Sequence, residues 1–182
     1  PYFKKRLDSI YSQTYAKFEA ILLDDCSQDD SVAILKDFQK RHPEKTRLAL
    51  NDENSGGVFH QWEKGLKLAK GELIWIAESD DWCSENFLSE LVKYFQDEAV
   101  TLAYCRTVFM DGASNEQMWS IEEYLAEIDQ DLWRSAFIRS AHEIVNHAWA
   151  TKNIVPNVSS ALFRKPVSMQ LLSENFWKQM RI

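Results

Sequence analysis

Apolar and polar residues alternate with two different periods along the first 110 residues of the chain. Short apolar runs rich in β-branched and aromatic residues indicate buried strands, and apolar residues spaced three or four apart indicate amphipathic helices. Helices and strands follow one another in turn, which is typical of an α/β fold with a mostly parallel sheet flanked by helices. The expected helices cover residues 2–11, 31–40, 58–70 and 85–95, and the expected strands cover residues 18–23, 47–50, 73–77 and 102–110.

The regular alternation stops after residue 112, but no linker or low-complexity segment divides the chain there. We therefore expect one domain with two halves, residues 1–112 and 113–182. A proline is favoured in the first turn of a helix, which marks one further helix start. The elements expected in the second half are helices over residues 120–128 and 132–140, a strand over 157–163 and a helix that begins at Pro166.

Polar clusters occur directly after three of the expected strands. Asp24 and Asp25 come after the first strand, residues 51–57 after the second, and residues 78–81 after the third. The carboxyl ends of parallel strands share one edge of the sheet, and ligands bind at that edge in open α/β folds. Each cluster alone is also explained as a turn or a helix cap, but their joint placement favours a shared binding site.

The third cluster has the chemistry of a metal–phosphate site. Asp80 and Asp81 are adjacent carboxylates, which repel one another unless a cation or hydrogen-bond donors neutralise them. Oxygen ligands of this kind suit Mg²⁺ or Mn²⁺, and both ions also bind phosphate oxygens. In the second cluster, Gly56 and Gly57 permit a close approach of the backbone to a ligand.

Composition narrows the choice of ligand and compartment. The 182 residues carry a formal net charge of -7 and no basic block, so a nucleic-acid partner is not expected. An anionic nucleotide would therefore need a metal or local donors. No apolar run reaches the length of a membrane span. Three cysteines cannot all pair, and we interpret them as reduced thiols of a cytoplasmic protein, with peripheral membrane attachment of a full-length protein as the alternative.

Four segments, in this order, carry a resemblance to a known family. They read KKRLDSIYSQTY at residues 4–15, LDDCSQDDS at 23–31, NSGG at 54–57 and IAESDDW at 76–82. Together they resemble family 2 of the glycosyltransferases, which are inverting, nucleotide-sugar-dependent enzymes with the GT-A fold. A weaker similarity, to the acceptor-side strand of some bacterial members, lies at residues 153–164.

The resemblance implies a role for each matching residue. It places Asp25 against the nucleotide base, Asn54 and Gly56 in the loop near the nucleotide, and Asp80 beside the ribose or diphosphate. It makes Asp81 the ligand of a Mn²⁺ or Mg²⁺ ion that neutralises the diphosphate leaving group. The implied partners are a nucleotide-diphosphate sugar, with a UDP-sugar favoured, and a carbohydrate or glycan-lipid acceptor. Residues 1–112 would then bind the donor, and residues 113–182 would form part of the acceptor side.

Three departures from the family pattern limit this interpretation. The strand with which family members usually begin has no counterpart, so the chain is expected to be truncated. The usual Ala-Arg-Asn-x-Gly is replaced by QWEKG at residues 61–65, which removes the Arg and the Asn. No motif matches the family's general base, so no catalytic residue is assigned and the base is expected beyond Ile182. The expected reaction is a direct displacement by a deprotonated acceptor hydroxyl.

Two alternatives remain open. The chain could instead be a non-catalytic nucleotide-sugar-binding or structural domain, which sugar transfer by a longer protein would exclude. A metal-dependent phosphatase or hydrolase that uses the Asp pair fits less well. Such enzymes usually need a nucleophilic Asp after the first strand, a Lys and a later acidic pair, and the order of residues in this chain differs.

Overall fold

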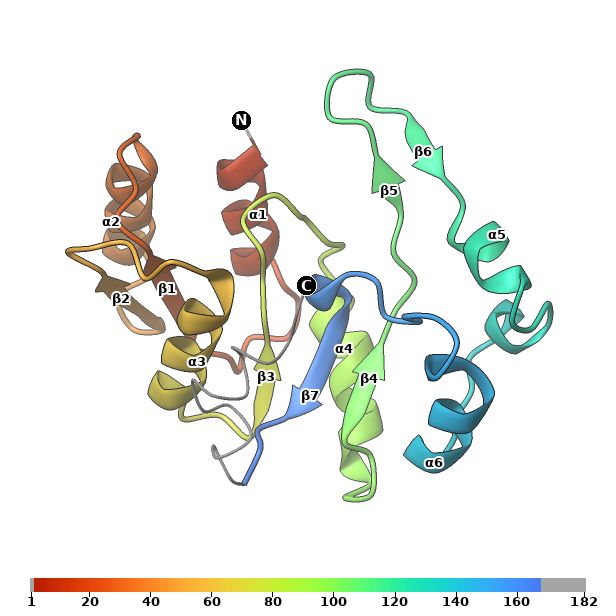
Figure 1. Cartoon of the computed structure of the whole chain (residues 1–182). Helices are drawn as coiled ribbons and strands as arrows, with labels where there is room; N and C mark the ends of the chain where they lie inside the picture. Colours follow the sequence, from red (N-terminus) through yellow and green to blue (C-terminus); the bar gives the residue numbers. More distant parts are fainter. Residues whose placement is uncertain (1, 168–182) are drawn as a thin grey trace. The chain divides into compact units, whose positions relative to one another are not determined.

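The computed structural model describes residues 2–167 of the chain. The chain forms two compact units, one from Pro1–Ala103 with Leu162–Ile182 and the other from Tyr104–Ala161 (Figure 1). The helix expected to begin at Pro166 lies outside the described residues for most of its length. The division into halves at residue 112 stays a prediction about function.

The first unit begins with alternating helices and strands, as the apolar pattern predicts. Strands β1 and β2 pair in parallel, with Ala20 opposite Thr46 and Asp24 opposite Leu50. Both strands therefore end at the same edge, which brings together the polar residues at their carboxyl ends. The elements are α1 (Tyr2–Tyr11), β1 (Ala20–Asp24), α2 (Ser31–Arg41), β2 (Thr46–Leu50) and α3 (Val58–Leu68).

A three-stranded sheet in the order β3-β7-β4 completes the strands of this unit. Strand β7 runs antiparallel to β3, with Leu73 opposite Arg164 and Trp75 opposite Leu162. The apolar run of β7 predicts a strand but not its direction, because the direction depends on the path of the chain. The elements are β3 (Leu73–Trp75), α4 (Phe87–Val92), a 3-10 turn (Lys93–Gln96), β4 (Leu102–Tyr104) and β7 (Ala161–Arg164).

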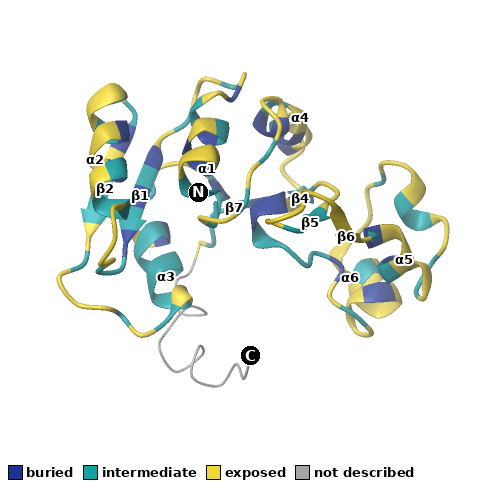
Figure 2. Ribbon diagram, turned by 90° about the horizontal axis from the view of Figure 1, so that it is seen from above, coloured by how far each residue is buried: buried dark blue, intermediate teal, exposed yellow. Residues whose placement is uncertain are grey.

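Two apolar clusters hold the first unit together, and Figure 2 shows their buried residues on α1, β1, α2 and α4. Phe38 of α2 is 1% exposed and packs with Leu7 of α1 and Leu22 of β1 in the first cluster. The second cluster forms around Phe87 and Leu162. Packing of this kind, rather than helix propensity, stabilises the short helices.

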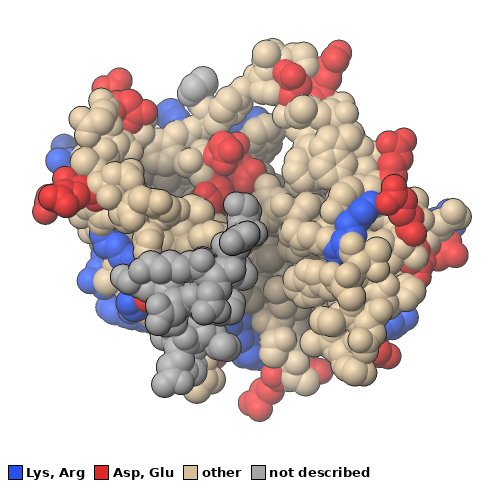
Figure 3. All heavy atoms as spheres, in the orientation of Figure 1, with Lys and Arg blue, Asp and Glu red and all other residues tan. Residues whose placement is uncertain are grey.

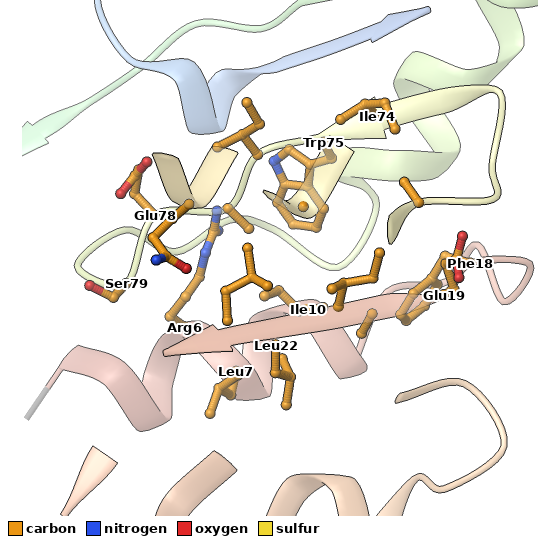
Figure 4. Close-up of a pocket in the computed structure, with 18 of the residues that line it drawn as sticks. Arg6, Leu7, Ile10, Phe18, Glu19, Leu22, Ile74, Trp75, Glu78 and Ser79 are labelled. Atoms are coloured by element: carbon orange, nitrogen blue, oxygen red, sulfur yellow. The ribbon is translucent and has the colours of Figure 1, made fainter. Parts of the chain in front are cut away.

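A large cavity of about 1390 Å³ lies within the first unit, and both β1 and β3 line it. Among the described residues, β1 pairs only with β2, and β3 pairs only with β7. The walls are mainly apolar, with Leu7, Leu22 and Ile74 among the lining residues (Figure 4). The carboxyl ends of both strands contribute the polar residues of the lining.

The second unit is small and has its own core of Ile121, Leu125, Ala148 and Ile154. The helix predicted over residues 132–140 is wrong, because only a 3-10 turn forms at Leu132–Arg134 and the chain is irregular to residue 140. The strand predicted over residues 102–110 is divided into β4 and β5. The elements of this unit are β5 (Phe109–Met110), β6 (Gln117–Trp119), α5 (Ile121–Ala126), α6 (Ala141–Ile144) and a π-helical turn (Val145–Trp149).

No helix in the described part of the chain is both long enough and apolar enough to cross a lipid bilayer.

The buried aromatic ring of α2 gives a direct test of the core. Phe38→Ala should lower the free energy of unfolding by about 3–5 kcal/mol, because it leaves a cavity among tightly packed side chains. Lys36→Ala is the control, since Lys36 is exposed on the same helix and its loss should change stability by no more than about 0.5 kcal/mol. Urea denaturation measures both values, and equal stabilities of the two variants would contradict this description of the core.

Candidate functional site

Asp25 comes directly after the last residue of β1 and lies at the centre of a hydrogen-bond network. Its Oδ1 accepts bonds from Asn51 Nδ2 at 2.7 Å and from the backbone N–H of Ser55 at 2.8 Å. A third bond to Oδ1 comes from Gln61 Nε2 of α3 at 2.7 Å. Oδ2 accepts one bond, from Ser55 Oγ at 2.8 Å. The carboxylate is therefore fixed by the end of β2, the loop after β2 and α3.

These donors keep Asp25 ionised. Partial burial works against the charge, but the bonds from Ser55, Asn51 and Gln61 outweigh it and hold the pKa of Asp25 below its ordinary value. Lys64 supports the network from behind, because its Nζ donates to Asn51 Oδ1 and so orients the Asn51 amide toward Asp25. The site thus presents a carboxylate that accepts hydrogen bonds and does not donate them.

Asn54 and Gly56 shape the loop beside Asp25. Asn54 Nδ2 donates to the backbone carbonyl of Asp25 at 3.0 Å, and Asn54 Oδ1 accepts from Gly56 N at 2.9 Å. Gly56 has φ of 82°, a left-handed conformation that disfavours a side chain. No heavy atom lies within 4 Å of a Cβ built at Gly56, so backbone conformation rather than crowding requires the glycine.

The acidic residues after β3 form a turn. The backbone N–H of Asp81 donates to the Glu78 carbonyl at 3.4 Å. The Glu78 carboxylate accepts a bond of 2.6 Å from Trp62 Nε1 of α3. Asp80 is exposed and lines the cavity together with Glu78, whereas Asp81 is half-buried and does not line it. Figure 3 shows acidic side chains gathered over the loop after β3.

Arg6 of α1 lies beneath this turn and is only 1% exposed. Figure 4 shows its side chain directed toward Glu78 and Trp75, and the guanidinium carbon lies 4.7 Å from the centre of the Trp75 ring. Its nitrogens make no hydrogen bond to any described residue, although the Cys83 thiol lies beside them. Burial lowers the pKa of Arg6, and the nearby Cys83 sulfur and the carboxylates of Asp81 and Glu78 oppose that shift. The buried cation therefore counters the charge of the acidic turn.

The predicted site residues divide into two groups. Asp25 and Asp80 line the same cavity, as expected from the ends of their strands. Asn54, Gly56 and Asp81 do not line it. Sequence reasoning missed Arg6, because it comes after Lys4 and Lys5 and reads as part of an exposed basic run. It also missed the side-chain donors Gln61 and Trp62, which replace residues of the family pattern.

The donor set suits a divalent cation only together with a ligand. The described residues contain no group of three His, Cys, Asp or Glu side chains that could hold a metal ion. The exposed Asp80 carboxylate and the neighbouring Asp81 do offer hard oxygen ligands. Mg²⁺ is commonly held by one or two carboxylates, substrate phosphates and water. The residues present therefore fit a metal that arrives with a diphosphate.

The network predicts the titration of Asp25. Asn51→Ala removes one donor and should raise the pKa of Asp25 toward its ordinary value of about 3.9. Because the folded-state pKa is depressed, the stabilisation is present above about pH 4 and is lost as the pH falls through the folded-state pKa. The stability difference between wild type and variant should therefore shrink in acid.

Carboxyl ¹³C titration by NMR measures this pKa. Gln28→Ala is the control, since Gln28 bonds to Cys26 and its loss should leave Asp25 unchanged. An Asp25 pKa that is the same in wild type and Asn51→Ala would show that the network does not stabilise the carboxylate.

The chain is similar to several known proteins. Residues 1–172 match the family described as glycosyl transferase family 2. The glycosyltransferase GlyG of Streptococcus pneumoniae serotype 4 is 36% identical over 97 residues, which is 53% of this chain and 32% of GlyG.

Two solved structures are also similar. The mannosyltransferase PcManGT of Pyrobaculum calidifontis, in complex with GDP-Man and Mn²⁺, has a TM-score of 0.53 and 28% identity. That match covers 59% of this chain and 32% of PcManGT. TarS of Staphylococcus aureus, in complex with UDP, has a TM-score of 0.53 and 26% identity, with 66% of this chain and 35% of TarS covered.

This chain spans about a third of the length of these relatives. Its similarity to the transferase structures confirms the predicted fold class, an α/β fold of the GT-A type. The family match covers most of the sequence, and the chain belongs to glycosyl transferase family 2.

Proposed function

We propose that this chain forms the donor-binding part of a glycosyltransferase that moves a sugar from a nucleoside diphosphate to an acceptor hydroxyl with the help of a divalent metal. The observation that carries the proposal is the placement of an ionised Asp25 and an exposed Asp80 on the same cavity. Asp25 after β1 is suited to bind the base of a nucleotide, and Asp80 after β3 is suited to a position beside its ribose or diphosphate. Membership of the family supports the same reaction class.

Asp25 recognises the base in this proposal. Its Oδ1 already accepts three bonds, whereas Oδ2 accepts one from Ser55 and retains capacity for a further donor. The imide N–H of uracil and the N–H edge of guanine are such donors. PcManGT binds GDP-Man and TarS binds UDP, which supports a nucleotide of either kind, and we favour a UDP-sugar. Asn54 and Gly56 hold the loop that frames the nucleotide.

The acidic turn serves the diphosphate. We assign Asp81 as the ligand of Mn²⁺ or Mg²⁺ and place Asp80 beside the ribose or diphosphate. The Mn²⁺ in the PcManGT complex supports the choice of metal. When bound, the metal supplies Lewis-acid stabilisation of the leaving diphosphate. Arg6 beneath the turn reduces the repulsion among the carboxylates before the metal arrives.

The reaction we propose is a displacement with inversion. The acceptor oxygen forms a bond to the anomeric carbon while the bond from that carbon to the diphosphate breaks, and the hydroxyl proton passes to a general base. We assign that base to no residue of this sequence. The acceptor is a carbohydrate or a glycan-lipid. We place the reaction in the cytoplasm, and an odd number of cysteines, three, which cannot all pair within the chain, supports a reducing compartment.

Release of UDP from a panel of UDP-sugars in the presence of an acceptor mixture tests the function. Sugar transfer is expected from a longer protein that contains this chain. Metal-dependent UDP binding without transfer by that protein would favour the non-catalytic alternative, and the absence of nucleotide binding would contradict both.

The metal assignment predicts different behaviour for the two adjacent aspartates. Asp81→Ala should remove the gain in UDP affinity that Mn²⁺ provides. Asp80→Ala should retain the gain in UDP affinity that Mn²⁺ provides, because Asp80 is not the assigned metal ligand. Isothermal titration calorimetry with UDP, in Mn²⁺ and in EDTA, separates the two effects. The opposite pattern, with Asp80→Ala alone abolishing the metal-dependent gain, would overturn the assignment of Asp81.

Base recognition gives an independent test. Asp25→Asn places an amide N–H₂ where the protein and the base both offer donors, so UDP binding should weaken by about 1–3 kcal/mol. The effect of Mn²⁺ on affinity should be retained, because the acidic turn is unchanged. Asp30→Asn removes the same charge at an exposed position outside the cavity lining and serves as the control. Equal affinities of the two variants would exclude Asp25 from base recognition.

A further inference from the structure

Trp62 links helix α3 to the acidic turn. Its indole N–H donates to Glu78 Oε1 at 2.6 Å, across sixteen residues of sequence. The Phe59 ring meets the Trp62 indole edge-on, with centroids 5.1 Å apart and planes at 89°. This contact restricts the orientation of the indole, and so of its single N–H donor. Trp62 occupies the position at which the family pattern usually has Arg. The side chain at this position is therefore still a hydrogen-bond donor, and it donates to the Glu78 carboxylate.

Glu78 belongs to the same turn as the two aspartates. The backbone carbonyl of Glu78 accepts the bond from Asp81 N that closes the turn, so Glu78 is part of the same local structure. Three carboxylates occur within residues 78–81, and they would push the turn outward in the absence of opposing partners. A bond from a neutral N–H to a carboxylate is charge-assisted and is stronger than one between neutral groups.

We propose that Trp62 is a positioning residue, which holds Glu78 so that the turn presents Asp80 and Asp81 to the metal–diphosphate group. The proposal rests on the proposed function. Trp62 also lines the cavity, but in the proposal it acts through Glu78, since a direct contact with the nucleotide would affect binding in EDTA as much as binding in Mn²⁺. Residues that hydrogen-bond directly to a metal ligand typically contribute about 10- to 100-fold to metal affinity or activity, and Trp62 acts one residue further away, so we expect an effect at the lower end of that range.

The simpler interpretation is that Trp62 only fills space next to Phe59. The positioning role requires the indole N–H group, whereas space filling does not. A phenyl ring at this position lacks the N–H group but keeps most of the packing against Phe59. Trp62→Phe therefore removes the proposed function of the side chain and retains its bulk.

Calorimetry of UDP binding in Mn²⁺ and in EDTA tests the proposal. Trp62→Phe should weaken Mn²⁺-dependent binding by about 10-fold and change binding in EDTA much less. Trp133→Phe is the matched control, because it also removes an indole N–H bond, of 2.9 Å to Tyr104 OH, in the second unit. The control should bind UDP like wild type.

A second variant tests the same link from the acceptor side. Glu78→Ala removes the acceptor of the Trp62 N–H bond, and an unchanged Mn²⁺-dependent UDP affinity of this variant alone would overturn the proposal. If Trp62 acts through Glu78, the double variant Trp62→Phe/Glu78→Ala should bind no more weakly than Glu78→Ala alone. Additive losses in the double variant would overturn the proposal.

The outcomes also separate this proposal from the proposed function. Mn²⁺-dependent UDP binding by wild type, together with an unchanged affinity of folded Trp62→Phe, would overturn the positioning role alone. A lack of Mn²⁺-dependent UDP binding by wild type would overturn the proposed function and the positioning role with it.

Discussion

Repulsion among carboxylates is the constraint on which this site depends. The fold places Asp25 after β1 and Glu78, Asp80 and Asp81 after β3, with Asp25, Glu78 and Asp80 on the lining of one cavity, in a chain whose net charge is already -7. Like charges in such an arrangement favour protonation or an altered structure unless partners neutralise them. Protein donors surround Asp25, Trp62 bonds to Glu78, and the buried Arg6 lies beneath the turn. Of the four acidic residues only Asp80 is exposed, so its carboxylate is accessible to a diphosphate that binds together with a metal ion.

Helix α3 connects the two halves of this arrangement. Its consecutive residues Gln61 and Trp62 donate to Asp25 and Glu78 respectively, so one helical turn supports both carboxylates. The helix can do this because it packs closely on β1. A Cβ built at Gly65 would lie 3.1 Å from Leu23 Cδ1, a distance that leaves no room for a larger residue without movement of the neighbour. The glycine therefore allows α3 to pack close to β1, at a distance from which Gln61 and Trp62 donate to their carboxylates.

Much of the first unit could be predicted because its elements are regular and its strands are apolar. The polar residues after β1 and β3 could be predicted because each group follows an apolar strand in the sequence. Asp25 and Asp80, one from each group, line the same cavity. The buried Arg6 could not be predicted, since its neighbours Lys4 and Lys5 make it look exposed. The role of Trp62 was hidden because an aromatic residue at helical spacing usually belongs to a core. The helix expected over residues 132–140 was wrong because its apolar residues do not form one buried face: Trp133 packs on the core of the second unit, whereas Ile138 is 67% exposed.

Paramagnetic NMR with Mn²⁺ and UDP tests the central claim most directly, because broadening reports proximity to the metal. Amide signals of residues 78–81 should broaden strongly when Mn²⁺ is added to the UDP-bound protein. The signals of Asn51, Ser55 and Gln61 should shift with UDP, since they surround the carboxylate proposed to bind the base. Broadening centred elsewhere in the chain, or UDP-induced shifts that leave those three residues unchanged, would contradict a nucleotide–metal site at the ends of β1 and β3.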